Sequence, residues 1–118
     1  MIRFSNPARR VALLLALATP ALGLIATRAA SAVPAKTQAV SIKMFAFTPQ
    51  VLTVTPGTTV TWTNADEDPH TVTANDKSFH SAALDTDDKY SYTFTKSGEF
   101  AYFCSLHPHM TGKVIVKG

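Results

Sequence analysis

The only cysteine of the chain, Cys104, is followed by His107 three residues later and by Met110 six residues later. A further histidine, His70, stands upstream in the segment "DPHTV". These side chains offer one thiolate, two imidazoles and one thioether. A structural zinc site would more often use several cysteines and has no need of a methionine. Two histidines and one cysteine in a plane, with a long axial methionine, are the ligands of blue-copper electron-transfer sites. The residue types and spacing therefore predict a copper site built from these four residues.

The other two histidines have different interpretations. His109 directly precedes Met110, and adjacent residues of an extended segment point to opposite sides. If Met110 faces the metal, His109 faces solvent. His80 lies in an irregular segment without a partner pattern, so we interpret it as solvated or locally hydrogen-bonded. Taken alone, Cys104 would more often be a buried inert thiol, and the metal interpretation depends on its neighbours.

The elements that must position these residues are strands. Apolar and polar residues alternate with period two in most of the chain after residue 37, which is typical of strands with one buried face. Turn-forming segments such as "TPGT", "NADEDP" and "KSGE" separate the alternating runs. Residues 78–88 are irregular and have room for a short helical turn. Many short strands with frequent turns predict an all-β sandwich or barrel.

The same alternation gives the direction of the candidate ligands. Cys104 continues the inward face of Phe100 and Tyr102 at the end of a strand. His70 is in phase with Val72, so it also should point inward. One tight loop between two strands then aims the thiol and the following ligands at one point, and His70 approaches from a neighbouring strand.

Other residues have structural interpretations. Met44 and Trp62 fall on inward positions of their alternating runs and are predicted to be core residues. The acidic runs 66–68 and 85–88 are predicted to be solvated loops, with the first close enough to His70 to touch a docking partner.

Residues 1–32 have the pattern of an export signal. A basic start precedes an apolar run at 11–25, and the small residues 30–32 form a cleavage site. The apolar run is shorter than the roughly 20 residues that a membrane span needs and contains a proline and a glycine. We therefore expect a signal peptide at 1–32, one domain at 33–118 located in the periplasm, and no membrane span after cleavage.

The charge balance changes once this segment is set aside. All four arginines lie within it, which leaves seven lysines against eight acidic residues. The basic isoelectric point of the whole chain thus gives no reason to expect nucleic-acid binding, and no basic patch is interleaved with aromatic residues. The remaining 86 residues form one small domain that cannot make an internal disulfide. A bound metal would both occupy the lone thiol and stabilise so small a fold.

At these residues the chain resembles the cupredoxins, and within them the amicyanin type, which is marked by the pattern C-x-x-H-P-x-M found at 104–110. The resemblance extends over about residues 41–117 and includes "VTPGTTVTWTN", "DPHTV" and "GEFAYFCSLHPHM". It implies a Greek-key β-sandwich of about eight strands with one type 1 copper ion at one end, cycling between Cu(I) and Cu(II). It also implies single-electron transfer between protein redox partners, such as a dehydrogenase, a cytochrome or an oxidase. We expect these partners to dock near His107 and His109 and the protein to be a monomer.

The chain departs from the amicyanin pattern at two positions. His109 stands where the amicyanin loop has a phenylalanine, which alters the surface that meets a partner. Thr71 stands where many relatives have an asparagine after the first histidine ligand. We expect Thr71 to hydrogen-bond to the region of Ser105, because such contacts orient metal ligands.

Three other function classes are open to a chain of this kind. A copper carrier without redox cycling could use the same ligands, but release favours open methionine- or histidine-rich surfaces, and Met44 is the only other methionine after residue 32. A multicopper oxidase needs many more histidines than four. A sandwich adhesion module has no need of the Cys-His-Met loop. The sequence therefore favours an electron carrier over an enzyme.

Overall fold

The structure is a computed structural model that describes residues 36–118. The predicted signal peptide and its cleavage site lie outside these residues. The described part contains eight strands and no helix, and thus no helix that is long and apolar enough to cross a membrane. The strands are β1 (Thr37–Lys43), β2 (Ala46–Thr48), β3 (Val51–Val54), β4 (Thr58–Asn64), β5 (Thr73–Ala74), β6 (Lys89–Phe94), β7 (Gly98–Cys104) and β8 (His107–Val116).

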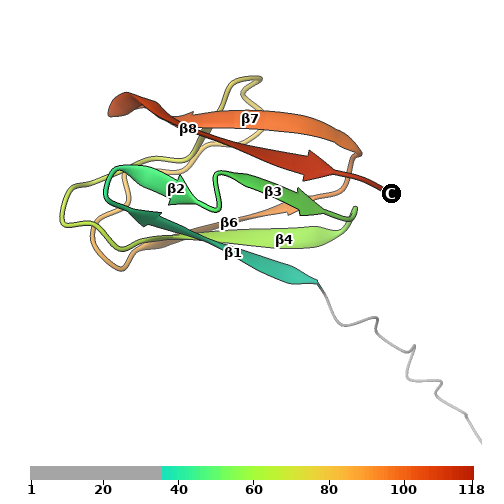
Figure 1. The fold of residues 1–118 in the computed structure, drawn as a ribbon, viewed down its shortest axis with the longest axis horizontal. Coiled ribbons are helices and arrows are strands. Elements are labelled where there is room, and N and C mark those ends of the chain that lie inside the picture. The colour runs from blue at the N-terminus through green and yellow to red at the C-terminus, as the bar shows by residue number, and fades with distance from the viewer. Residues whose placement is uncertain (1–35) are drawn as a thin grey trace, which may run out of the picture. The chain divides into compact units, whose positions relative to one another are not determined.

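The strands form two four-stranded sheets, in the orders β2-β1-β4-β6 and β3-β8-β7-β5 (Figure 1). The pairs β1–β4 and β3–β8 are parallel, and the remaining pairs are antiparallel. The two sheets bury their facing sides against each other, which confirms the predicted all-β sandwich of about eight strands. Because β7 and β8 are neighbours joined by residues 105–106, the Cys-to-Met segment lies at one end of the second sheet.

Strand β4 shows why the alternating sequence forms this sandwich. Its buried and partly exposed residues alternate without a break from Thr58 to Asn64. On the outer face, hydroxyl groups pair across to β6, with Thr59 bonded to Thr93 at 2.8 Å and Thr61 bonded to Ser91 at 2.7 Å. Threonine suits this face because its branched side chain packs on the pleat while its hydroxyl stays near water.

The core between the sheets is centred on Trp62, which is fully buried as predicted. Its ring contacts those of Phe79, Phe94 and Tyr102, at centroid separations of 5.4–6.4 Å. Tyr102 in turn lies over its cross-strand partner Gly112, where a β-carbon would overlap the phenol ring. The aromatic rings therefore fix the spacing of the sheets directly beneath the end of β7 that carries Cys104.

Met44 is not a core residue, contrary to the prediction. Strand β1 ends at Lys43, and Met44 and Phe45 form the two-residue turn to β2, with φ values of 52° and 56°. Positive φ at both central positions is the pattern of a type I′ hairpin turn, which takes both residues off the pleat. Met44 is 81% exposed. The alternation that predicts an inward side chain ends where the strand ends.

Residues 78–88 contain no helical turn. Instead, isolated bridges tie this segment to the preceding one, pairing His80 with Thr73 and Leu84 with His70. The second bridge includes two backbone hydrogen bonds between His70 and Leu84, of 3.1 and 2.7 Å. The irregular segment thus holds the backbone of His70, which lies in an isolated bridge outside the eight strands and not on a strand as predicted.

Candidate metal centre

Cys104 is the last residue of β7 and is completely buried. It lies on the inward face that includes Tyr102, as the alternation predicts. The pairing of β7 with β8 shifts register between Phe103 and Cys104, so that Cys104 faces His107 across the turn. Such an irregularity re-aims a side chain at the end of a sheet. Here it lets the thiol and an imidazole from adjacent strands meet.

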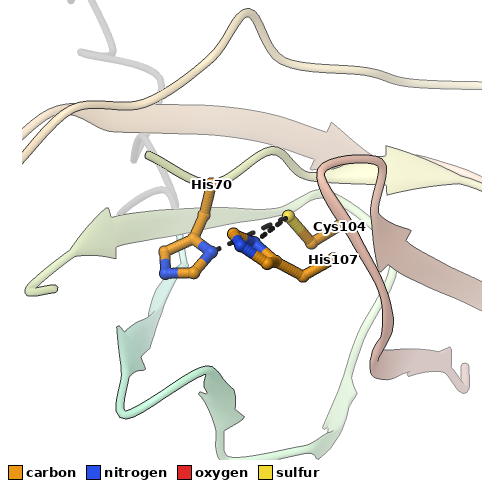
Figure 2. Close-up of side chains that lie close together, drawn as sticks. All are labelled: His70, Cys104 and His107. Carbon is orange, nitrogen blue, oxygen red and sulfur yellow. Dashed lines mark hydrogen bonds between the residues drawn. The ribbon is translucent and has the colours of Figure 1, made fainter. Parts of the chain in front are cut away.

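Three of the four predicted ligands come together (Figure 2). The Nδ1 atom of His70 and the Nδ1 atom of His107 each lie 3.7 Å from the Sγ atom of Cys104. One ligand atom from each of the three residues lies within 4.8 Å of the others. No other group of three or more histidine, cysteine or acidic residues in the described part of the chain has this closeness.

These separations fit a single metal ion between the three residues. Metal–sulfur and metal–nitrogen bonds to ions of the size of Zn²⁺ are about 2.3 and about 2.0 Å long. At a trigonal angle, these bonds separate the sulfur and nitrogen atoms by about 3.7 Å, which matches both observed distances. A neutral thiol has a single proton to donate, so a cysteine–histidine hydrogen bond accounts for one of these approaches, whereas one metal ion accounts for both.

Protein contacts hold the His70 ring at both of its nitrogen atoms, the one that faces Cys104 and the one on the opposite side. It is completely buried, and its Nε2 atom lies 2.8 Å from Oδ2 of Asp66. Its ring stands edge-on to that of Phe45, with centroids 5.3 Å apart. A histidine ligand that hydrogen-bonds through its second nitrogen has a fixed tautomer and ring orientation. The imidazole is therefore preorganised by protein contacts alone.

The Asp66 side chain is not solvated, contrary to the prediction for residues 66–68, whereas Glu67 and Asp68 are exposed as predicted. Its carboxylate accepts hydrogen bonds from the backbone N–H groups of Met44 and Phe45, at 2.6 and 3.0 Å, in addition to the contact with His70. Partial burial raises the pKa of the Asp66 carboxyl, but these hydrogen bonds outweigh it and hold the pKa below its usual value. The group is thus ionised at neutral pH and acts only as an acceptor.

Thr71 makes hydrogen bonds both to the sulfur atom of Cys104 and to the residue that follows it, Ser105. The backbone N–H of Thr71 donates to Sγ of Cys104 at 3.3 Å. The hydroxyl of Thr71 accepts from the N–H of Ser105 at 2.7 Å and contacts the Ser105 hydroxyl at 2.8 Å. The predicted contact between Thr71 and the Ser105 region is therefore confirmed. It ties the segment after one histidine to the residue after the cysteine.

The rest of the loop separates inward from outward side chains. Met110 is buried, whereas His109 beside it is exposed, as predicted from their adjacency. His107 is only partly buried. Next to it, Phe45 and Leu106 are each 49% exposed, and the Phe45 ring lies edge-on to His107 with centroids 5.0 Å apart. The outer side of the candidate centre is thus an imidazole set among exposed apolar side chains.

The sequence interpretation missed Phe45 and Asp66 as part of the site. A signal for Asp66 was present, since an acid four residues before a histidine ligand in a tight loop can reach back to it. No comparable signal existed for Phe45, because its place over the imidazoles depends on a turn that lies more than 20 residues away along the chain.

The chain is similar to known proteins over most of its length. Residues 11–116 match the family model described as the cupredoxin-like domain. The chain is 40% identical over 95 residues to amicyanin of Paracoccus versutus, covering 75% of this chain and 71% of that protein. It is 33% identical over 105 residues to amicyanin-alpha of Methylorubrum extorquens, covering 85% and 88%. Among solved structures, an amicyanin variant in the Cu(I) form superposes with a TM-score of 0.65 at 32% identity, covering 69% of this chain and 82% of that one.

Proposed function

The chain belongs to the cupredoxin family, and from that premise we propose that it is a small blue copper protein that carries single electrons between protein partners. The observation that carries the proposal is the convergence of two imidazole Nδ1 atoms on one cysteine sulfur at equal distances of 3.7 Å. This is the donor set of a type 1 copper site.

The residues have distinct roles in this proposal. His70, Cys104 and His107 would hold the copper ion together, and Met110 would add a soft thioether donor. When bound, the ion supplies a one-electron couple between Cu(I) and Cu(II). The sulfur ligands favour Cu(I) and the imidazoles suit Cu(II). Because the ligands project from two strands and a hydrogen-bonded loop, the same arrangement serves both states and little has to move.

The geometry supports a carrier in preference to an enzyme. The four proposed ligands account for the donor set of such a site, and no further histidine, cysteine or acidic side chain in the described residues joins His70, Cys104 and His107. No ligand position is then left for a substrate. Electrons would enter and leave through the partly exposed His107, among Phe45 and Leu106, where protein partners such as a dehydrogenase, a cytochrome or an oxidase would dock close to His109.

The cellular setting is part of the same proposal. We infer that residues 1–32 are a signal peptide and that residues 33–118 act as a monomeric domain in the periplasm. Support comes from the basic start, apolar run and small-residue site of the sequence, and from a lone cysteine that a metal would protect in an oxidising compartment.

Titration of the copper-free protein with Cu(II) tests the function. We expect one equivalent to produce the intense visible band of a cysteine-ligated site and to raise the melting temperature, because copper binds the folded site preferentially. The band should vanish on reduction and return on oxidation through many cycles. A weak, pale spectrum with copper passing readily to a chelator would instead indicate a copper carrier without redox cycling.

A further inference from the structure

One carboxylate contacts three nitrogen atoms from two parts of the fold at the back of the metal centre. Oδ1 of Asp66 accepts the N–H of Met44 at 2.6 Å. Oδ2 accepts the N–H of Phe45 at 3.0 Å and lies 2.8 Å from Nε2 of His70. Two of these donors belong to the turn between β1 and β2, and the third belongs to a proposed copper ligand more than 20 residues further along the chain.

Asp66 is itself held in place. The side chain of Asn64, which is completely buried, accepts the backbone N–H of Asp66 at 2.8 Å. The amide of Asn64 donates to the carbonyl oxygens of Asp68 and Leu84, at 2.9 and 2.8 Å. Leu84 also bonds the backbone of His70. The loop is therefore a fixed frame in which the carboxylate and the imidazole have set positions relative to each other.

The turn that Asp66 holds has a direct relation to the metal centre. Met44 and Phe45 both have positive φ, a conformation that non-glycine residues rarely adopt. Their two N–H groups point at one carboxylate, which favours this turn over other conformations. As a result the Phe45 ring stands edge-on to both His70 and His107, at interplanar angles of 89° and 85°.

We propose that Asp66 is the positioning residue of the metal centre: its carboxylate fixes the Nε2–H tautomer and the ring plane of His70 and joins to them the turn that places Phe45 over both imidazoles. An acceptor at Nε2 requires that nitrogen to carry the proton, so Nδ1 presents its lone pair toward Cys104. The inference rests on the proposed function for the identity of the metal, but the proton position and the turn are properties of the copper-free protein.

The chemistry of this contact requires a carboxylate and not an amide. An asparagine at 66 has one acceptor and one NH₂ group in place of two acceptors. If its NH₂ group faces His70, that nitrogen must become the acceptor, and the proton moves to Nδ1, where it blocks the metal. If its oxygen faces His70, the NH₂ group opposes the N–H of Met44 and the turn loses a bond. Either orientation disrupts at least one of the two functions that Asp66 joins, because the atom that faces His70 also faces the N–H of Phe45.

Nitrogen-15 NMR of the copper-free protein at pH 8 tests the proposal directly. We expect wild-type His70 to be the Nε2–H tautomer, with a slowly exchanging Nε2 proton. Asp66→Asn should give a mixture or the Nδ1–H tautomer, and its Cu(II) affinity in a competition assay should fall by about 10- to 100-fold. Asp66→Glu, which keeps the carboxylate, should restore part of this loss. Asp68→Asn is the matched control, because it makes the same acid-to-amide change at an exposed position of the same loop.

Two results would overturn the proposal. One is an Nδ1–H tautomer for His70 in the wild-type protein, a measurement that remains decisive even if Asp66→Asn does not fold. The other is an Asp66→Asn protein whose tautomer and Cu(II) affinity equal those of Asp68→Asn. Failure of the proposed function is a different outcome: the wild-type protein would lack the intense visible band while His70 still showed the Nε2–H tautomer.

Discussion

The two histidines at the metal centre present the same atom to the same sulfur, yet they lie in different surroundings. His70 is completely buried, its backbone is bonded to Leu84, and its second nitrogen contacts Asp66. His107 is partly exposed at the start of β8, and its outer neighbours are the exposed side chains of Phe45 and Leu106. Figure 2 shows the two rings approaching Cys104 from separate segments.

This difference separates two tasks that a redox centre must perform. A site that accepts and donates an electron needs ligands that do not rearrange, and it also needs a path to its partner. The buried imidazole serves the first need because the protein restrains both of its nitrogens. The partly exposed imidazole serves the second because its edge lies at the surface. The following predictions test whether this division holds, beginning with the change that both histidines share.

Replacing Cys104 by serine should have the largest effect, because both imidazoles converge on its sulfur. The intense visible band should be absent and copper binding at best weak and colourless. The strands should still form, since serine is close to cysteine in size and the rest of the core is unchanged, and far-ultraviolet circular dichroism checks this. An intense band that survives in Cys104→Ser would contradict the proposed ligand set.

Cavity variants of the two histidines should then separate their roles. In His107→Gly, added imidazole should restore the visible band, because the vacated position is open to solvent. In His70→Gly, the vacated position is enclosed, so imidazole should fail to restore it, and the melting temperature of the copper-free protein should also fall. Optical titration with imidazole provides the measurement. Equal rescue of both variants would show that the positions of His70 and His107 do not differ in their access to solvent.

Replacing Thr71 by valine should have an effect of intermediate size, on the side of the centre that holds His70. The change removes the acceptor of the Ser105 N–H while keeping the shape of the side chain. Because Ser105 is exposed, the expected loss is that of an ordinary hydrogen bond, about 0.5–1.5 kcal/mol. The backbone N–H of Thr71 still reaches Cys104, so the visible band should remain. Thermal unfolding and the reduction potential are the readouts. Thr73→Val is a suitable control, because its hydroxyl contacts Thr71 but does not reach the Ser105 backbone.

Replacing His109 by phenylalanine should have the smallest effect on the centre itself. The side chain is exposed on the face opposite to Met110, and surface changes of this kind usually shift stability by less than about 0.5 kcal/mol. We expect an unchanged spectrum and an altered rate of electron transfer with partner proteins. Loss of the visible band would show that His109, and not His107, is the ligand in this loop.

Much of the site could be predicted from the sequence because its components are local. Cys104, His107 and Met110 lie at the end of β7 and the start of β8, on either side of one tight turn, so their spacing restricts them to one place. Period-two alternation gave the inward direction of Cys104 and His70, and adjacency placed His109 opposite Met110. The contact of Thr71 with Ser105 followed from the two segments meeting at the ligands. These inferences depend only on backbone geometry and on the side-chain types that copper prefers.

Only the tertiary structure placed Met44, Phe45 and Asp66. Alternation predicted a buried Met44, but the β1–β2 turn has positive φ at both of its residues, and that conformation is supported by a carboxylate from a distant loop. The same carboxylate looked like part of a solvated acidic run. Sequence periodicity indicates which side chains of one strand face the solvent and which face the core. Whether a charged side chain stays in water or joins two loops depends on which donors the fold brings to it, and those donors come from residues far away along the chain.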